Sequence, residues 1–185
     1  MEDSMLFNIT AAFRRVTDIT PEMLRKMGIK GLILDIDNTL AGHNNPLPAK
    51  GVIEWLDCMR QNDIRLVILS NNFYSRVKMF AELLGLDYIS GAKKPFRKSY
   101  QLAAMKMRLP KHALAAVGDQ IFTDVLGANL FDIKMLYTMP IGTTSGLLYR
   151  VRKTIEILFL PEKIHYKQHQ IEYKPVKTIT YKDAE

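Results

Sequence analysis

The sequence predicts an α/β protein, a three-layer α/β/α sandwich around a central parallel sheet. Short apolar runs alternate along most of the chain with segments whose apolar residues recur at helical spacing. This alternation is typical of right-handed βαβ units. The run Gly31-Leu32-Ile33-Leu34 also lacks the polar/apolar alternation of a half-exposed strand, so we expect it to be buried on both faces. With 185 residues, 48% of them hydrophobic, the chain can form one domain with a substantial core.

Capping and turn residues place the individual elements. The first predicted helix, residues 21–27, has Thr20 as N-cap and Pro21 at its first position, and Gly28 closes it. Glycine readily takes the left-handed conformation after a helix, so the helix at 74–84 is expected to end at Gly85. The predicted strands are residues 30–36, 64–69, 87–90, 113–117 and 133–137. The other predicted helices are residues 50–61, 99–107, 123–130 and 147–160.

The helix at 50–61 and the end of the chain carry two further expectations. The helix is expected to bury its apolar residues at helical spacing, which are Val52, Ile53, Leu56 and Met59. Cys58 lies in the same pattern with Trp55 and Met59, which predicts a buried, inert thiol, and a single cysteine excludes an internal disulfide. We expect one domain over residues 1–160 and a polar, basic tail over 161–185 that is disordered or ordered by a partner.

Charge and the apolar pattern limit the classes of function. The net charge of +7 favours anionic partners, whether nucleic acid, acidic lipid headgroups or phosphorylated substrates, and does not choose among them. No stretch approaches the roughly 20 apolar residues of a membrane-spanning helix. The N-terminus carries acids at Glu2 and Asp3 and no basic n-region before an apolar core, which argues against a secretory signal. We therefore expect a cytoplasmic protein.

Polar residues follow several predicted strands. Because the carboxyl ends of parallel strands meet at one edge of the sheet, we expect these residues to lie together. Two carboxylates separated by one residue, Asp35 and Asp37, call for a cation such as Mg²⁺. A nucleophile, an acid/base, a phosphate-binding hydroxyl, a lysine and a metal-holding acid are what phosphoryl transfer to a protein carboxylate requires. The residues in chain order are Asp35, Asp37, Ser70, Asn71, Lys93, Lys94, Asp119 and Asp124.

Four short motifs in this order resemble those of the haloacid dehalogenase (HAD) phosphatase superfamily. The similarity covers residues 31–137 and implies a HAD-like Rossmannoid fold. Together with the lead-in Gly28-Ile29-Lys30-Gly31, it is similar to the YqeG-like proteins of subclass IIIA. The four motifs are Asp35-Ile36-Asp37-Asn38-Thr39-Leu40, Leu69-Ser70-Asn71, Lys94 within Lys93-Lys94-Pro95, and Gly118-Asp119-Gln120-Ile121-Phe122-Thr123-Asp124.

The resemblance implies a role for each group in the transfer. Asp35 would attack phosphorus and become an aspartyl phosphate, and Asp37 would protonate the leaving alkoxide and then activate water. Lys94 would neutralise developing charge; Lys93 is the alternative, although the proline that follows favours Lys94. The groups implied to bind the phosphoryl group, in addition to Lys94, are Ser70, Asn71 and Thr39. For Thr39 the residues alone also permit a role as a loop brace.

The resemblance also implies a Mg²⁺ site. Its ligands would be the carboxylates of Asp35 and Asp119 and the backbone carbonyl of Asp37, because Mg²⁺ prefers oxygen ligands. Asp124 would orient a metal-bound water or Lys94 from the second shell. Manganese and cobalt remain open as alternatives. Each aspartate has a plain structural alternative, because an Asp after a strand often serves only as a cap or turn residue.

The spacing between motifs predicts a capless enzyme. Residues 40–70 hold one loop, one helix and one strand, and residues 70–94 hold little more, so neither stretch has room for a cap domain. A capless site suits a bulky substrate, or is closed by a second subunit in a homo-oligomer. Without either, a small metabolite would stay exposed to bulk water.

The resemblance extends to the mitochondrial phosphatidylglycerophosphate phosphatases, which implies a lipid substrate and a place in phospholipid metabolism. Phe13-Arg14-Arg15 and residues 147–160 could then dock on anionic lipid at the inner face of the membrane, at about 1 kcal/mol per basic side chain. The alternative for residues 147–160 is packing on the sheet. Rival functions are a phosphatase of a soluble phosphoester, phosphoprotein or nucleic-acid end, and a non-catalytic module associated with nucleic acid or the ribosome, for which no binding motif is present.

Overall fold

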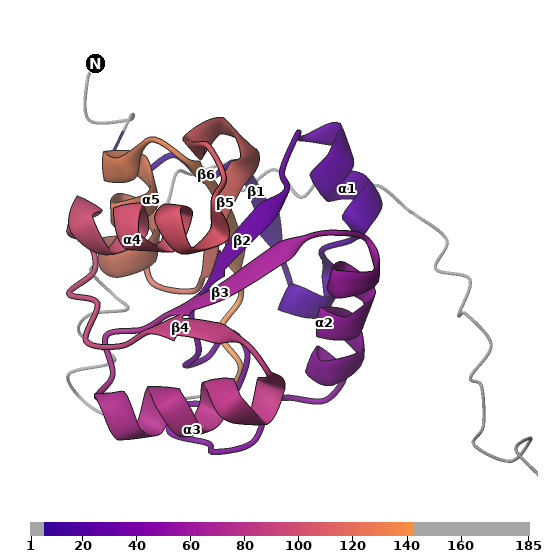
Figure 1. Ribbon diagram of the computed structural model, residues 1–185, viewed down its shortest axis with the longest axis vertical. Coiled ribbons are helices and arrows are strands. Elements are labelled where there is room, and N and C mark those ends of the chain that lie inside the picture. Colours follow the sequence, from indigo (N-terminus) through magenta and orange to yellow (C-terminus); the bar gives the residue numbers. More distant parts are fainter. Residues whose placement is uncertain (1–5, 143–185) are drawn as a thin grey trace, which may run out of the picture.

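The computed structural model describes residues 6–142, which form a six-stranded sheet covered by helices on both faces (Figure 1). The strand order is β1-β6-β5-β2-β3-β4, and every neighbouring pair is parallel. The predicted α/β/α architecture is therefore confirmed. The strands are β1 (Ala11–Phe13), β2 (Gly31–Leu34), β3 (Arg65–Leu69), β4 (Asp87–Ile89), β5 (Leu114–Gly118) and β6 (Lys134–Thr138). The α-helices are α1 (Pro21–Lys26), α2 (Val52–Gln61), α3 (Tyr74–Leu84), α4 (Arg97–Met107) and α5 (Leu126–Phe131).

The sheet separates two apolar cores, because successive strand residues face opposite sides. In β2, Leu32 and Leu34 pack with residues of α1, α2 and α3, whereas Ile33 packs with residues of α4 and α5. Figure 1 shows α1 and α2 on one side of the sheet and α4 and α5 on the other. All four β2 residues are buried, as the absence of polar/apolar alternation predicted. This buried central strand fixes the position of the acidic motif that follows it.

The capping residues act as predicted. Thr20 accepts a hydrogen bond from the backbone N–H of Met23 through its Oγ1 at 3.3 Å, and α1 begins at Pro21. Gly28 and Gly85 both take the left-handed conformation, with φ of 70° and 60°. α3 has the predicted bounds, and the other elements that were predicted within the described residues differ by a few residues at their ends.

Two elements were not predicted as they occur. β1 is a three-residue edge strand that pairs only with β6, too short to show a periodic pattern. The helix predicted at 123–130 is instead a π-helical turn, Ile121–Val125, followed by α5. The predicted helix at 147–160 and the tail at 161–185 lie outside the described residues. Within residues 6–142, no helix has both the length and the apolar character needed to cross a membrane.

Two burial predictions for α2 are wrong. Cys58 is exposed rather than buried, and Ile53 is 50% exposed. The buried stripe of α2 consists of Val52, Trp55, Leu56 and Met59. At 100° per residue, Ile53 and Cys58 both project roughly 100–120° from the centre of that stripe, so they face solvent.

Phe13 is also placed differently from what membrane docking would require. Its side chain is only 8% exposed and belongs to the core on the α1–α3 side of the sheet. The aromatic ring of Phe13-Arg14-Arg15 is therefore part of the fold and cannot insert into lipid.

The capless architecture is confirmed. Between β2 and β3 the chain forms one loop and α2, and between β3 and Lys94 it forms α3 and β4. Both stretches are described in full, and neither contains an additional domain. Nothing inserted into these stretches covers the carboxyl edge of the sheet.

Candidate active site

The acidic motif after β2 is fixed by backbone pairing and a tight turn. The N–H of Asp35 donates to the carbonyl of Val117 at 3.0 Å, which extends the β2–β5 ladder by one residue. The N–H groups of Leu40 and Ala41 both donate to the carbonyl of Ile36, at 2.9 and 3.0 Å, so the chain turns back at once. As a result Asp35 is only 5% exposed although it lies in a loop.

Lys94 connects two of the predicted site residues. Its Nζ donates to Asp35 Oδ1 and to Asp124 Oδ1, at 2.6 Å in each case, and all three side chains are buried. Burial alone would lower the pKa of Lys94, but the carboxylates of Asp124 and Asp35 outweigh it and raise the pKa above its usual value. Lys94 therefore stays charged within the site.

Asn71 positions Lys94. The backbone N–H of Lys94 donates to Asn71 Oδ1 at 2.7 Å, and Asn71 Nδ2 donates to the carbonyl of Lys94 at 3.3 Å. Asn71 thus ties the loop after β3 to the loop after β4. Both the amide oxygen and the amide nitrogen of Asn71 are therefore engaged by the backbone of Lys94. A contact of Asn71 with a phosphoryl group stays a prediction. Lys93 is exposed, so the geometry distinguishes the two lysines and places only Lys94 beside Asp35.

Burial disfavours the negative charge of Asp35. Burial raises its pKa to about 7, and the ion pair with Lys94 opposes this rise only in part, while the charge of Asp124 adds to it. Oδ2 of Asp35 is buried and, among the described residues, has no hydrogen-bond partner. A cation bound at this oxygen would offset the cost.

Three carboxylates form a group that fits a hard cation. Asp35, Asp119 and Asp124 are all buried, and each offers an oxygen within 4.8 Å of the others. Mg²⁺ binds carboxylate oxygens, and Oδ2 of Asp35, which has no hydrogen-bond partner among the described residues, is available as a metal ligand. These residues therefore fit the predicted cation. The side chain of Asp37 does not belong to this group.

Asp124 is positioned by a close approach of the backbone at the end of β5. A Cβ atom on Gly118 would lie 2.4 Å from Cγ of Asp124, so only glycine leaves room for this carboxylate. The N–H of Gln120 donates to Asp124 Oδ2 at 3.2 Å, and the buried Tyr100 hydroxyl donates to the carbonyl of Thr123 at 3.1 Å. The π-helical turn therefore directs Asp124 toward Lys94.

Asp37 is held by groups that the sequence did not indicate. Its Oδ1 accepts a hydrogen bond from Arg76 at 2.5 Å and another from the backbone N–H of Asn44 at 3.1 Å. Its Oδ2 accepts from Asn72 Nδ2. Asn72 directly follows the second motif, which is a signal that could have found it. Arg76 sits at the third position of α3, and no local pattern relates it to Asp37.

The remaining predicted residues lie around this arrangement. Ser70 is 2% exposed, and its Oγ accepts from the N–H of Asn72 at 3.2 Å, which leaves its hydroxyl hydrogen available. Thr39 is 1% exposed, with an Oγ1 that has no hydrogen-bond partner among the described residues. The predicted residues thus share one edge of the sheet, with Lys94, Asp35 and Asp124 in direct contact.

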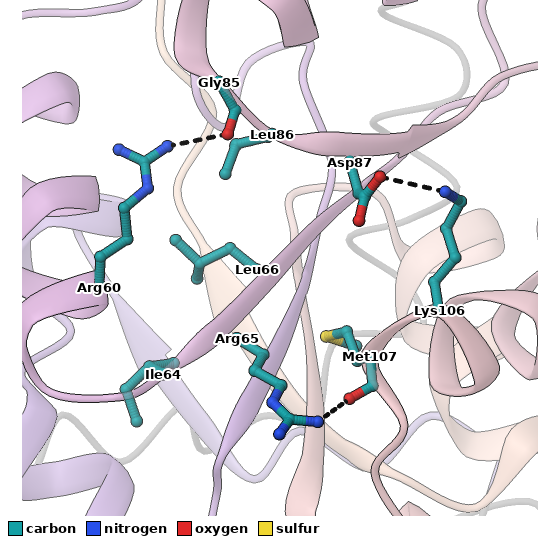
Figure 2. Close-up of a pocket in the computed structure, with 9 residues that line it drawn as sticks. All are labelled: Arg60, Ile64, Arg65, Leu66, Gly85, Leu86, Asp87, Lys106 and Met107. Atoms are coloured by element: carbon teal, nitrogen blue, oxygen red, sulfur yellow. Dashed lines mark hydrogen bonds and ion pairs between the residues drawn. The ribbon is translucent and has the colours of Figure 1, made fainter.

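The opposite edge of the sheet has a hollow of about 290 Å³ at the start of β3 and β4 (Figure 2). Its cations have structural partners: Arg60 donates to the carbonyls of Leu84 and Gly85 at the end of α3, and Arg65 donates to the carbonyl of Met107 at the end of α4. Lys106 pairs with Asp87 at 3.1 Å. Arg60 and Arg65 thus cap helix ends and Lys106 forms an ion pair, so the cations of this hollow have structural roles.

Comparison with known proteins places the chain in a family. The model of the haloacid dehalogenase-like hydrolase family matches residues 41–132 of this chain. The protein named "Probable phosphatase YqeG" of Bacillus subtilis (strain 168) is 36% identical over 143 residues, which cover 77% of this chain and 83% of that protein. The chain belongs to the haloacid dehalogenase-like hydrolases. The predicted similarity to YqeG-like proteins is confirmed, and this HAD-like hydrolase is an enzyme.

Solved structures resemble this HAD-like hydrolase more weakly. A hydrolase of the haloacid dehalogenase-like family from Brucella suis 1330 is 11% identical, with a TM-score of 0.49 over 69% of this chain and 93% of that chain. An uncharacterized protein from Corynebacterium glutamicum ATCC 13032 Kitasato is 21% identical, with a TM-score of 0.49 over 73% of this chain and 98% of that chain.

Proposed function

We propose that the protein is a Mg²⁺-dependent phosphatase that forms an aspartyl phosphate on Asp35, with the lipid phosphate phosphatidylglycerophosphate as its substrate. The observation that carries the phosphatase proposal is the buried contact of Lys94 with Asp35 and Asp124 in a HAD-like hydrolase. A carboxylate beside a charged lysine, in a site that also fits a divalent cation, has the groups needed to accept a phosphoryl group.

The proposed reaction has two displacement steps. The Asp35 carboxylate attacks phosphorus, the bond from phosphorus to the substrate oxygen breaks, and Asp37 donates a proton to the leaving alkoxide. Asp37 then takes a proton from water as that water attacks the aspartyl phosphate, which releases inorganic phosphate and regenerates Asp35. Lys94 stays protonated throughout and neutralises charge on the transferring group. Ser70, with its hydroxyl hydrogen available, donates to a phosphoryl oxygen; Thr39 is proposed to bind there as well.

Magnesium would be held by the carboxylates of Asp35 and Asp119 and the backbone carbonyl of Asp37. When bound, it supplies positive charge that offsets the negative charge of the phosphoryl oxygens. Asp124 lies in the same acidic group, but we propose that it is not a direct ligand, because its Oδ1 accepts a hydrogen bond from Lys94 and its Oδ2 accepts one from the N–H of Gln120. Its proposed task is to keep Lys94 in place.

The lipid substrate is supported by access and charge. Within residues 6–142 no inserted domain closes the carboxyl edge of the sheet, which suits a phosphate delivered on a large surface. The net charge of +7 favours an anionic surface over a neutral one. The family resemblance to phosphatidylglycerophosphate phosphatases points the same way. We propose that the product is phosphatidylglycerol.

The test compares Asp35→Asn with a matched surface variant, Asp57→Asn. Asp57 is an exposed acid of α2 that pairs with Arg60 at 2.7 Å, far from the proposed chemistry. We expect Asp35→Asn to abolish Mg²⁺-dependent phosphate release from an aryl phosphate and from phosphatidylglycerophosphate in detergent micelles, and Asp57→Asn to match wild type. Undiminished turnover by folded Asp35→Asn would contradict the assignment of Asp35 as the nucleophile. Turnover of the aryl phosphate without any turnover of phosphatidylglycerophosphate would remove the lipid substrate.

A further inference from the structure

Large apolar side chains are exposed in three loops at the carboxyl edge of the sheet. Phe73 is 73% exposed, Phe96 is 67% exposed and Leu47 is 61% exposed. They come from the segments that follow β3, β4 and β2 respectively. Soluble surfaces often expose single apolar side chains, but several on loops at the same edge of a sheet indicate an interaction surface.

Each of the three residues is close in sequence to a contact of the site. Phe73 follows Asn72, whose side chain donates to Asp37. Phe96 is two residues beyond Lys94. Leu47 is three residues beyond Asn44, whose backbone N–H also donates to Asp37. These contacts place the three loops beside the site residues, so the exposed side chains belong to segments that are fixed next to the acidic cluster.

Positive charge accompanies these apolar side chains. Lys93, Arg97 and Lys98 are exposed, and the described residues hold no carboxylate within ion-pair distance of them. Arg97 and Lys98 occupy the first turn of α4, and this turn contains no acidic residue. Cations at a helix N-terminus oppose the helix dipole, so their placement there does not serve the stability of α4. It does place three exposed cations at this edge.

We propose that the carboxyl rim, consisting of Leu47, Phe73, Phe96, Lys93, Arg97 and Lys98, seats the enzyme on an anionic phospholipid bilayer. Aromatic and aliphatic side chains inserted at the headgroup level, beside cations that meet anionic lipid, are the combination that holds peripheral proteins at a membrane. The positive charge of the rim favours this occupant over an uncharged apolar partner. The proposal rests on the proposed lipid substrate, because a phosphate in the headgroup plane would then face Lys94.

The fold supplies a matched control surface. Leu83 is 53% exposed and Met105 is 65% exposed, so their side chains are nearly as accessible as those of the rim. They lie near the ends of α3 and α4, helices that run away from the carboxyl edge toward the amino edge of the parallel sheet. Replacing them removes a similar apolar area at the other side of the molecule.

The experiment measures sedimentation of the full chain with vesicles, in the Asp35→Asn background so that no turnover alters the lipid. One set of vesicles contains equal parts phosphatidylglycerol and phosphatidylcholine, and the other contains phosphatidylcholine alone. We expect binding to the anionic vesicles only. We expect Phe73→Ser/Phe96→Ser to weaken that binding about tenfold or more, Arg97→Glu/Lys98→Glu to do the same at low salt, and Leu83→Ser/Met105→Ser to leave it unchanged. Thermal unfolding confirms that each variant is folded.

The outcomes separate this proposal from the proposed function. Anionic binding that falls only with the two rim variants supports the carboxyl rim, even if wild type does not hydrolyse phosphatidylglycerophosphate. Four results overturn it: binding to neither kind of vesicle, equal binding to both, unchanged binding by the rim variants, or an equal loss with Leu83→Ser/Met105→Ser. Unchanged binding by folded rim variants would mean that another part of the chain docks.

Discussion

Gly118→Ala tests whether the close approach at the end of β5 positions Asp124. The added Cβ would lie 2.4 Å from both Cγ and Oδ2 of Asp124, about 1 Å inside the 3.4 Å at which ordinary van der Waals contact begins. Asp124 must therefore move, which endangers its 2.6 Å contact with Lys94 and its 3.2 Å hydrogen bond from Gln120. Overpacking of this kind costs about 1–3 kcal/mol of unfolding free energy.

The activity should fall further than the stability alone would require. A lost charge-assisted hydrogen bond is worth about 1.5–3 kcal/mol, so we expect kcat to drop by roughly 10- to 100-fold, with Lys94 no longer held beside Asp35. Steady-state kinetics on an aryl phosphate and urea unfolding measure the two effects. Gly42→Ala is the control, because a Cβ there would meet nothing closer than 3.9 Å. Gly118→Ala with wild-type activity and stability would refute the positioning argument.

Two further predictions concern the charges of the site. In the metal-free protein, burial raises the pKa of Asp35 from 3.8 to about 7, so its contribution to stability is complete below 3.8 and is lost as pH rises through about 7. Mg²⁺ competes with that proton, so the increase in Tm caused by Mg²⁺ should be larger at pH 8 than at pH 6, and Asp35→Asn should lose this pH dependence. An equal increase at both pH values in wild type would contradict it. Arg76→Ala removes the 2.5 Å ion pair of Asp37, and we expect kcat to fall by about 10-fold or more with little change in KM, a lower Tm because a buried carboxylate loses its cation, and partial restoration of kcat in Arg76→Lys. If KM rises while kcat is unchanged, Arg76 acts on substrate binding instead.

Local signals were sufficient to predict most of the fold. The buried strand β2 follows from four consecutive apolar or small residues, and the end of α3 follows from Gly85, because each feature depends on residues close in sequence. β1 could not be predicted in the same way. It has three residues, and its partner β6 is more than 100 residues away along the chain, so nothing local distinguishes it from a loop.

The candidate site shows the same division. The motif residues could be expected to share one edge because parallel strands end there, and the structure brings Asp35, Lys94 and Asp124 into contact. The partner of Asp37 could not be predicted, because the ion pair with Arg76 depends on how α3 packs beside the loop after β2. The exposure of Cys58 was missed for a related reason: a small shift in the assumed centre of the buried stripe of α2 decides whether it faces the core or solvent.

Two neighbouring asparagines after β3 serve different motifs. Asn71 holds the backbone of Lys94, and Asn72 holds the carboxylate of Asp37. The positions of Lys94 and Asp37 relative to each other therefore depend on two adjacent residues, each of which holds one loop of the site. Replacing either asparagine would release one of these contacts, and inserting or deleting one residue between 70 and 73 would shift one group relative to the other. The segment is consequently constrained both in length and at its two asparagines.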